Sequence, residues 1–464
     1  NKPGDYRSWW KTFNDPVLDS LIDKAYKENL SLRMAAMRVL EARTQLGIAQ
    51  GELFPQTQTI SGSLQKERLS KNAASAISAA KFSQVEFGAG AIWELDFWGK
   101  YRRQIQSAKA NWLSSVADYD NALVTLTADV ATLYINIATV ETRLEIATQN
   151  TRTQKESLKL TVQRYKTGAV TLLDVEQAKT ILNNTLATIP PLQTQLRQDK
   201  NALCVLLGMA PDNLTQILKA KTKIPLSPAR IITGIPADLL RRRPDIRSAE
   251  YQAIAQCNQI GVAKAELYPA LSLNGTFGFS SSDIGPAKLK DVFKWQSRNY
   301  QAGPSFQWNV LNYGQITNNV RFQDARFQET LVNYQNTVLI AQQEVEDNLI
   351  AFLKSQKRAQ LLSKSVSSAK TSLGLSIKQY QEGLKDFTTV LNAEQSLLAE
   401  QDNLAIALGD IANNTVALYR ALGGGWEIRE GKNLIPADIA KEMTKRTDWG
   451  NLLKPESYNP GIQK

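Results

Sequence analysis

The chain carries one order of sequence landmarks twice. Glu52-Leu53-Phe54-Pro55 returns as Glu266-Leu267-Tyr268-Pro269, and four further landmarks return in the same order about 215 residues later. These four are Trp98-Gly99 with Tyr313-Gly314, Tyr165-Lys166-Thr167-Gly168 with Tyr380-Gln381-Glu382-Gly383, Glu176-Gln177 with Glu394-Gln395, and Leu207-Gly208 with Leu422-Gly423. The repeat indicates an internal duplication, so the two halves must fold into similar structures.

Each half predicts a helix, two strands, a long helix, a turn and a last helix. In the first repeat, 1–240, we expect helix 15–50, strands 56–66 and 84–98, long helix 99–165, tip 165–174, helix 174–207 and an equatorial segment 208–240. In the second, 241–426, we expect helix 243–268, strands 270–281 and 299–312, long helix 314–380, tip 380–392 and helix 388–422, before an equatorial tail 427–464. Asp15 before Pro16 marks the first helix start, because proline favours the first helical position.

The strand pattern is clearest from Val85 to Phe97, where every second residue is apolar or small. The residues between them are polar or glycine with one exception, which predicts a strand with one apolar and one wet face. Four such strands could form a half-buried sheet of a soluble protein. Their length and terminal aromatic residues favour membrane strands, which need about 9–11 residues and carry aromatic girdles. Pro304 predicts a local irregularity in the last strand.

The long helices carry coiled-coil patterns. From Ile105 to Ala147, apolar or small residues recur in alternating steps of three and four, and the pattern returns from Phe327 to Phe352. No proline or glycine interrupts the first of these helices between Gly99 and Gly168. A helix over 99–165 would be about 100 Å long at 1.5 Å per residue.

Composition excludes several classes of protein. The 464 residues include no histidine, which rules out imidazole bases, Ser/His/Asp triads and histidine metal sites. No phosphate-binding G-x-x-x-x-G-K-[ST] motif occurs. We therefore expect no enzyme, and we assign no catalytic, cofactor-binding or metal-binding residue.

The charge pattern and hydropathy narrow the choice further. The net charge is +11, but 55 basic residues are scattered among 44 acidic ones, which indicates solvated helix faces rather than a nucleic-acid surface. No run of about 18 apolar residues predicts a transmembrane helix. Only two cysteines occur, and they do not indicate a disulfide framework.

Counting membrane crossings constrains the assembly. Each strand pair goes out and returns, so all helices would lie on one side and the loops 67–83 and 282–298 on the other. Four strands cannot close a barrel, because membrane barrels need at least about eight and open edges are not viable in lipid. The chain must therefore associate, and two, three or four copies would each satisfy this requirement.

Six motifs carry a resemblance to a known family. They are ELFP with ELYP, WELDFWGK, YKTG before LLDVEQA, LRRRPDI, YQEG before VLNAEQSL, and YRALGGGW, in family order over residues 10–426. With these motifs the chain resembles the TolC-like outer membrane factors, and within them the drug-efflux outer membrane lipoprotein branch (OprM-like). The resemblance implies an α+β membrane protein. In it, three chains share a twelve-stranded transmembrane β-barrel, four strands per chain, continued by a long α-helical coiled-coil tunnel.

The resemblance also implies a function and partners. It describes a passive exit duct for drugs or other small molecules, in the outer membrane of a Gram-negative bacterium with the tunnel in the periplasm. A periplasmic adaptor (membrane fusion) protein and an inner-membrane efflux pump would be the partners of the homotrimer. It would also contact outer membrane lipid, with no nucleic acid and no cofactor. The branch is lipidated at its mature N-terminus, which a chain beginning at Asn1 leaves open.

Two other functions remain open from the residues. One is an exit duct for type I protein secretion, built on the same kind of channel. The other, from a different class, is a trimeric coiled-coil surface adhesin or structural rod. An adhesin usually groups its strands at one terminus, whereas these strands occur within both halves of the chain.

The resemblance places a periplasmic gate at the two tips, where Gly168 and Gly383 permit the chain to reverse. The implied gate residues are Tyr165, Asp174, Tyr380, Lys385, Thr388 and Asn392. The implied adaptor-docking residues are Gly168, Ala169, Val170, Thr171, Gly383 and Leu384. Asn392 stands where the family usually has aspartate, and Thr388 where the branch has leucine, so the charged ring and the apolar plug should both be weaker. Asp174 has a second interpretation as a helix cap.

The remaining segments suit a belt around the middle of the tunnel. Segments 1–14, 208–240 and 427–464 combine short helices, prolines and mixed charge. Arg241-Arg242-Arg243 could be a basic recognition patch. A position at the entry of the following helix is favoured, because Pro244 and Asp245 suit the first turn of a helix.

Overall fold

The computed structural model describes residues 6–68, 70, 81–218, 223–227, 242–284, 286 and 288–459. The chain divides into two compact units. The sheet unit comprises Val39–Ser115 and Ser248–Gln335, and the tip unit comprises Asn1–Arg38, Val116–Arg247 and Asn336–Lys464. Each unit therefore combines segments from both halves of the duplicated chain.

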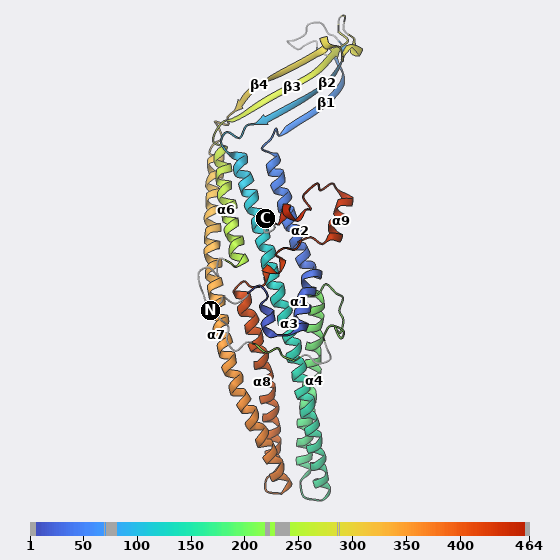
Figure 1. Ribbon diagram of the computed structural model, residues 1–464, viewed down its shortest axis with the longest axis vertical. Helices are drawn as coiled ribbons and strands as arrows, with labels where there is room; N and C mark the ends of the chain where they lie inside the picture. Colours follow the sequence, from blue (N-terminus) through green and yellow to red (C-terminus); the bar gives the residue numbers. More distant parts are fainter. Residues whose placement is uncertain are drawn as a thin grey trace. The chain divides into compact units, whose positions relative to one another are not determined.

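The sheet unit contains four antiparallel strands in sequence order (Figure 1). They are β1 (Thr57–Arg68), β2 (Lys81–Glu94), β3 (Ala270–Ser282) and β4 (Arg298–Gln307). β2 and β3 join the two halves, with Gly88 opposite Gly278. A Cβ atom at Gly278 would lie 2.8 Å from the carbonyl oxygen of Phe87, so glycine permits the close approach of these strands. Among the described residues, β1 and β4 each pair on one side only.

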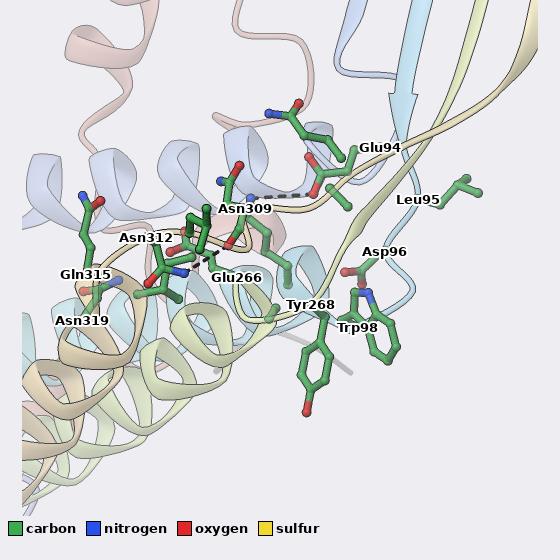
Figure 2. A pocket seen from close by; sticks show the side chains of 16 residues that line it. Glu94, Leu95, Asp96, Trp98, Glu266, Tyr268, Asn309, Asn312, Gln315 and Asn319 are labelled. Atoms are coloured by element: carbon green, nitrogen blue, oxygen red, sulfur yellow. Dashed lines mark hydrogen bonds and ion pairs between the residues drawn. The ribbon is translucent and has the colours of Figure 1, made fainter.

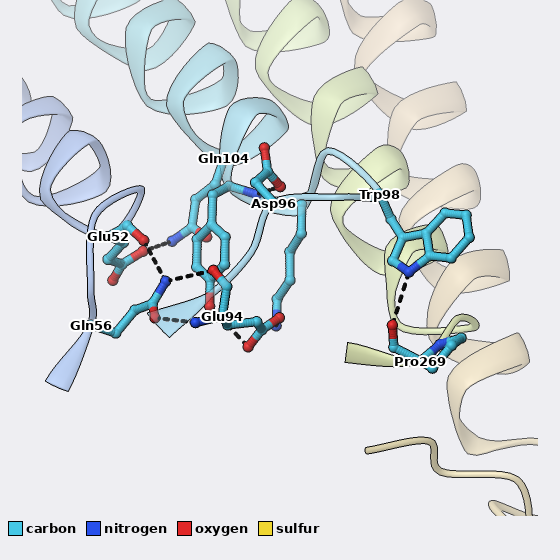
Figure 3. Close-up of polar contacts among 9 residues, drawn as sticks. Glu52, Gln56, Glu94, Asp96, Trp98, Gln104 and Pro269 are labelled. Atoms are coloured by element: carbon cyan, nitrogen blue, oxygen red, sulfur yellow. Dashed lines mark hydrogen bonds and ion pairs between the residues drawn. The ribbon is translucent and has the colours of Figure 1, made fainter. Parts of the chain in front are cut away.

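Two predicted strands end earlier than expected, β2 at Glu94 instead of residue 98 and β4 at Gln307 instead of 312. At the end of β2, the side chain of Gln56 takes the place of a strand partner (Figure 3). Its Oε1 accepts from the Glu94 amide at 2.7 Å and its Nε2 donates to the Glu94 carbonyl at 3.2 Å. Asp96 then starts the next helix by accepting from the backbone amides of Tyr101 and Arg102.

The irregularity that Pro304 predicted is absent from the register of β4. Pro304 pairs with Leu273 within an unbroken antiparallel ladder. β4 is an edge strand, and an edge strand tolerates a residue that lacks an N–H group. The predicted irregularity was wrong, because the edge position of β4 in this sheet accommodates Pro304 without a bulge.

Aromatic side chains gather where the strands meet the helices. The Trp98 indole donates to the Pro269 carbonyl at 2.9 Å and stacks on Tyr268 at 4.5 Å between ring centroids. Trp98 and Tyr268 lie at the rim of a cavity of about 650 Å³ (Figure 2). One contact occurs in both halves: Trp93 donates to the Leu53 carbonyl and Trp308 to the Leu267 carbonyl, each at 3.1 Å. The duplication is thus visible in side-chain contacts.

The first predicted helix is interrupted. Instead of one helix over 15–50, the chain forms α1 (Pro16–Glu28) and α2 (Leu30–Gly51). Asn29 between them has an extended backbone, accepts from the Leu32 amide at 2.8 Å and donates to the Leu206 carbonyl at 2.9 Å. Its side chain starts α2 as an N-cap, a local role that the apolar pattern does not reveal.

The long helices recur in pairs. α3 (Lys100–Lys166) and α7 (Gln315–Gln381) have 67 residues each, and α4 (Leu172–Leu206) and α8 (Phe387–Ala421) have 35 each. α6 (Pro244–Ala265) precedes β3. Of the described helices, α3 alone holds an 18-residue window that could cross a membrane by length and composition. The window has a mean hydropathy of 1.5 and is 67% buried, as in a helix at the core of a bundle.

The chain also contains short helices, and a buried ion pair attaches its last part to α3. The short elements are η1 (Trp9–Phe13), η2 (Leu289–Asp291), η3 (Trp295–Ser297), η4 (Trp426–Arg429), α9 (Ala437–Arg446) and α10 (Pro455–Tyr458). Arg429 pairs with the fully buried Asp120 of α3 and donates to Asn459 at 2.9 Å. Much of the predicted equatorial segment 208–240 lies outside the described residues.

The arginines before α6 make structural contacts. Arg243 donates to the Ala421 carbonyl at 2.8 Å and forms ion pairs with Asp245 and Glu344. Arg242 pairs with Glu427 at 3.1 Å, and Arg241 lies outside the described residues. These contacts agree with the helix-entry interpretation of this run rather than with a recognition patch.

Candidate gate at the helical tips

The first tip joins α3 to α4 through a glycine reversal. Gly168 has a φ of +75°, a left-handed conformation that glycine adopts without strain. The Ala169 amide bonds the Arg164 carbonyl at 2.9 Å, and the Gly168 amide bonds the Tyr165 carbonyl at 3.0 Å. These bonds satisfy the last carbonyls of α3 and end the helix.

Asp174 caps the helix that follows this tip. Its carboxylate accepts from the Thr171 amide at 2.9 Å and from the Thr171 hydroxyl at 2.8 Å. The capping interpretation weighed for Asp174 therefore has direct structural support. A carboxylate in the first turn also suits the positive end of the helix dipole.

The second tip, between α7 and α8, reverses in the same way. Gly383 also has a φ of +75°, the Leu384 amide bonds the Gln379 carbonyl at 2.9 Å, and the Gly383 amide bonds the Tyr380 carbonyl at 3.1 Å. The helix start differs, because Asp386 precedes α8 without a side-chain capping bond.

Tyr380 is the most deeply buried of the gate candidates. Its side chain is 3% exposed and packs against Phe387 with 5.1 Å between ring centroids. The Arg164 guanidinium lies over the same ring at 4.6 Å from its centroid, and Arg164 also donates to the Tyr380 carbonyl oxygen. Because Arg164 belongs to the other tip, it ties the two hairpins together.

Arg164 was missed in the sequence analysis. It lies in the last turn of α3, where a basic residue commonly interacts with terminal carbonyls. Its repeat counterpart is the neutral Gln379, and that difference between the halves was the available signal.

The other candidates are not brought together within one chain. Tyr165 is 43% exposed, and Lys385, Thr388 and Asn392 are also exposed. The docking candidates Gly168, Ala169, Thr171, Gly383 and Leu384 are exposed, whereas Val170 packs against the apolar cluster of the tip unit. Of the six gate candidates, only Tyr380 is buried.

An apolar cluster holds the helices together near the tips. Its buried members are Ala178 and Ile181 of α4, Leu373 and Tyr380 of α7, and Phe387, Val390, Leu391, Ala393 and Leu397 of α8. Glu394 is buried on the same stretch of α8, 3% exposed, and its Oε1 accepts from the Ser157 hydroxyl at 2.6 Å. Burial raises the pKa of Glu394, and the Ser157 hydrogen bond offsets part of the rise.

A polar stripe on α3 faces α8. Its six members recur at every seventh residue: Asp129, Asn136, Arg143, Asn150, Ser157 and Arg164. Their partners, in the same order, are Arg420 at 3.6 Å, Asn413 at 2.9 Å, Asp402 at 2.7 Å, Gln401 at 2.8 Å, Glu394 at 2.6 Å and the Tyr380 carbonyl. Seven residues are close to two helical turns, so all six lie on one face. Five partners are on α8, and the sixth is Tyr380 at the end of α7.

Family comparisons match most of the chain. The model of the outer membrane efflux protein family matches residues 21–209 and 235–424. Nodulation protein T of Rhizobium leguminosarum bv. viciae is 31% identical over 426 residues, covering 90% of this chain and 84% of the relative. The solvent efflux pump outer membrane protein SrpC of Pseudomonas putida is 31% identical over 425 residues, covering 90% and 87%.

Solved structures give the same result. The outer-membrane channel OprN has a TM-score of 0.86 at 30% identity, covering 92% of this chain and 95% of that one. The Campylobacter jejuni CmeC outer membrane channel has a TM-score of 0.83 at 26% identity, covering 96% and 92%.

These similarities confirm the predicted fold and the predicted location in the outer membrane. The neighbours are TolC-like outer membrane channels with a periplasmic helical tunnel, and they are passive channels rather than enzymes. Family members work as trimeric channels with adaptor and pump partners. The chain belongs to the outer membrane efflux protein family.

Proposed function

We propose that three copies of this chain form the exit duct of a tripartite efflux system, gated at the helical tips. The duct is passive, so its function is conduction and the control of its aperture. A periplasmic adaptor would bind the tips, and an inner-membrane pump would supply energy and cargo.

The sheet unit supports the shared barrel. Its two outer strands have a free hydrogen-bonding edge among the described residues, and four strands cannot close alone. Large apolar side chains on these strands are exposed, among them Ile60 at 78% and Phe306 at 73%. Lipid and neighbouring copies would cover such a surface, whereas its exposure to water is unfavourable. Three copies give twelve strands.

The contact of Arg164 with Tyr380 is the observation that supports the proposed gate most directly. It joins the first hairpin to the second by a cation–π contact and a hydrogen bond to a backbone carbonyl. Opening would require α7 and α8 to move at the tip, and this contact would resist that movement. The exposed Tyr165, Lys385, Thr388 and Asn392 would then meet neighbouring copies around the aperture.

The exposed turns support docking of the adaptor. Gly168, Ala169, Thr171 and Gly383 present small surfaces, and Leu384 is 69% exposed at the second tip. A partner helix or loop could cover Leu384 and hydrogen-bond the turn, while Val170 would anchor the first turn from below.

Small molecules are the proposed cargo. Relatives at 28–31% identity include proteins described as solvent, toluene and antibiotic efflux pump outer membrane proteins. The drug-efflux motifs of this sequence point in the same direction.

The test combines mass with conductance. The protein, purified in detergent, is weighed by light scattering and inserted into planar bilayers. A trimer with small single-channel currents that increase in an Arg164→Ala variant is expected. Arg152→Ala is the matched control, because Arg152 is an exposed arginine on the same helix. A monomer that stays soluble without detergent and conducts no current would contradict the proposal.

A further inference from the structure

Two glutamates that begin the repeated Glu-Gln landmark have opposite environments, and Glu394 lies three residues further along its helix than Glu176. Glu176 is the third residue after Leu173 on α4, is exposed and pairs with Lys179 at 2.7 Å. Its counterpart Glu394 on α8 is 3% exposed and has a serine, not a cation, as its partner. The same residue type is therefore a surface charge in one half and a buried group in the other.

The groups around Glu394 provide no compensating positive charge. α3 contributes the Ser157 hydroxyl, and the nearest arginine of the polar stripe, Arg164, is engaged with Tyr380. α4 contributes the apolar Ala178 and Ile181 to the adjoining cluster, and α7 contributes Leu373 and Tyr380. Among the described residues, burial and Ser157 alone shift the pKa of Glu394.

Glu394 thereby differs from the other carboxylates in the contacts of the polar stripe. The other two carboxylates of the stripe contacts, Asp129 and Asp402, each face an arginine. An ionised carboxylate that is buried without a cation is costly, so such a group stays neutral or moves to water. Ser157, the partner of Glu394, lies in the stripe between Asn150 and Arg164, on the part of α3 that leads to the tip.

We propose that Glu394 is a proton-controlled latch between α8 and α3. When the carboxyl is protonated, it stays buried against Ser157 and the tip remains packed. When it loses the proton, the carboxylate moves to water and α8 separates from α3 near the tip. This inference rests on the proposed function, because it adds control by pH to the gate.

The direction of the pH effect follows from linkage. The packed state holds the proton more tightly than a separated state, in which Glu394 would have an ordinary carboxyl pKa. The packed state is therefore fully favoured below the ordinary pKa and loses this advantage as pH rises through the raised pKa. Each unit of difference between the two pKa values changes the opening equilibrium about tenfold.

The experiment measures single-channel open probability of the trimer in planar bilayers between about pH 4 and about pH 8. The wild type should open more as pH rises, by about tenfold for each unit of pKa difference. Glu394→Gln should stay at the low-pH level throughout, because glutamine is neutral and still accepts from Ser157. Glu176→Gln, the matched control from the other half, should keep the wild-type profile.

A third variant tests positioning by Ser157. Ser157→Ala removes a hydrogen bond that favours the ionised carboxylate, so the midpoint should move up by about one pH unit. A purely structural serine would change the open probability at every pH without moving the midpoint.

Hydrogen exchange of the first turns of α8 provides a readout that does not depend on conduction. Exchange in detergent should accelerate with pH beyond its chemical rate in the wild type and not in Glu394→Gln. Identical pH profiles of wild type and Glu394→Gln by both methods would overturn the latch. A protein that does not conduct but shows the exchange difference would contradict the duct and leave the latch supported.

Discussion

The two tips share one backbone and differ in what they bury. Both reverse at a glycine with a φ of +75°, and both end their long helix with the same pair of amide–carbonyl bonds. The first tip leaves Tyr165 exposed and is stabilised locally by the Asp174 cap. The second buries Tyr380 and has no side-chain cap. One tip is therefore held by its own turn, and the other by contacts with its neighbours.

The second hairpin therefore depends more on the surrounding structure than the first. The local bonds of the first tip survive when the hairpins part. The second loses the Arg164 contact, and Glu394 loses Ser157. We therefore expect the second tip to change more on opening. Four pairs of substitutions test the comparison, and local opening free energies from hydrogen exchange of the tip amides provide a common measurement.

The largest effect is expected at the tyrosines. Tyr380→Ala removes a buried aromatic ring and should reduce the local opening free energy by about 3–5 kcal/mol. Tyr165→Ala should change it by less than about 0.5 kcal/mol, because Tyr165 is exposed. Tyr380→Phe should be neutral or stabilising, since the buried Tyr380 hydroxyl has no hydrogen-bond partner among the described residues. Equal losses at the two alanine variants would remove the asymmetry.

The next effect is expected at the residue that joins the tips. Arg164→Ala should cost about 1–2 kcal/mol at the second tip and raise conductance, because it removes a cation–π contact and a hydrogen bond. The repeat counterpart Gln379→Ala should leave both quantities near wild type. Unchanged conductance in Arg164→Ala would exclude this residue from the gate.

Substitutions at Asp174 and Asp386 distinguish a helix-capping role from a gating role. Asp174→Ala should destabilise the first turn of α4 by about 1 kcal/mol, whereas Asp386→Ala should have little effect on α8, which lacks a capping bond. Asp174→Asn keeps an acceptor for Thr171 and removes the charge. Conductance that rises in Asp174→Asn would support a gate role of the charge, and wild-type conductance would leave Asp174 a cap.

The smallest effect on stability is expected at Lys385. Lys385→Ala should change the local opening free energy by less than about 0.5 kcal/mol, because Lys385 is exposed in the single chain. If neighbouring copies use it at the aperture, conductance should nevertheless rise. Lys166→Ala, an exposed lysine of the first tip, is the control, and equal conductance of the two variants would exclude Lys385 from the gate.

The fold was largely accessible from patterns in the sequence. Alternation along β2 and the apolar steps of α3 gave the element types, and Gly168 and Gly383 marked the reversals. The patterns failed where one side chain decides, as at Asn29, which divides the first helix, and at Gln56, which ends β2. Such contacts depend on which backbone groups lie nearby in space, and periodicity carries no information on this.

The candidate gate was less accessible, because the signals at the two tips are nearly the same. The resemblance pointed to Tyr165 and Tyr380 alike, and the structure buries only Tyr380. Arg164 was missed because its partner is Tyr380, more than two hundred residues away in the chain. The polar stripe was overlooked because the search for seams followed apolar residues.

The duplication, the strand and helix periods and the places where the chain turns follow from local preferences that are present in both halves of the sequence. Non-local packing, in contrast, determines which of two equivalent groups is buried. Tyr165 and Tyr380 occupy matching positions, yet only Tyr380 is buried, with Phe387 and Arg164 packed against its ring. Burial depends on the faces that non-local packing covers, and a repeated sequence can have its two copies packed differently.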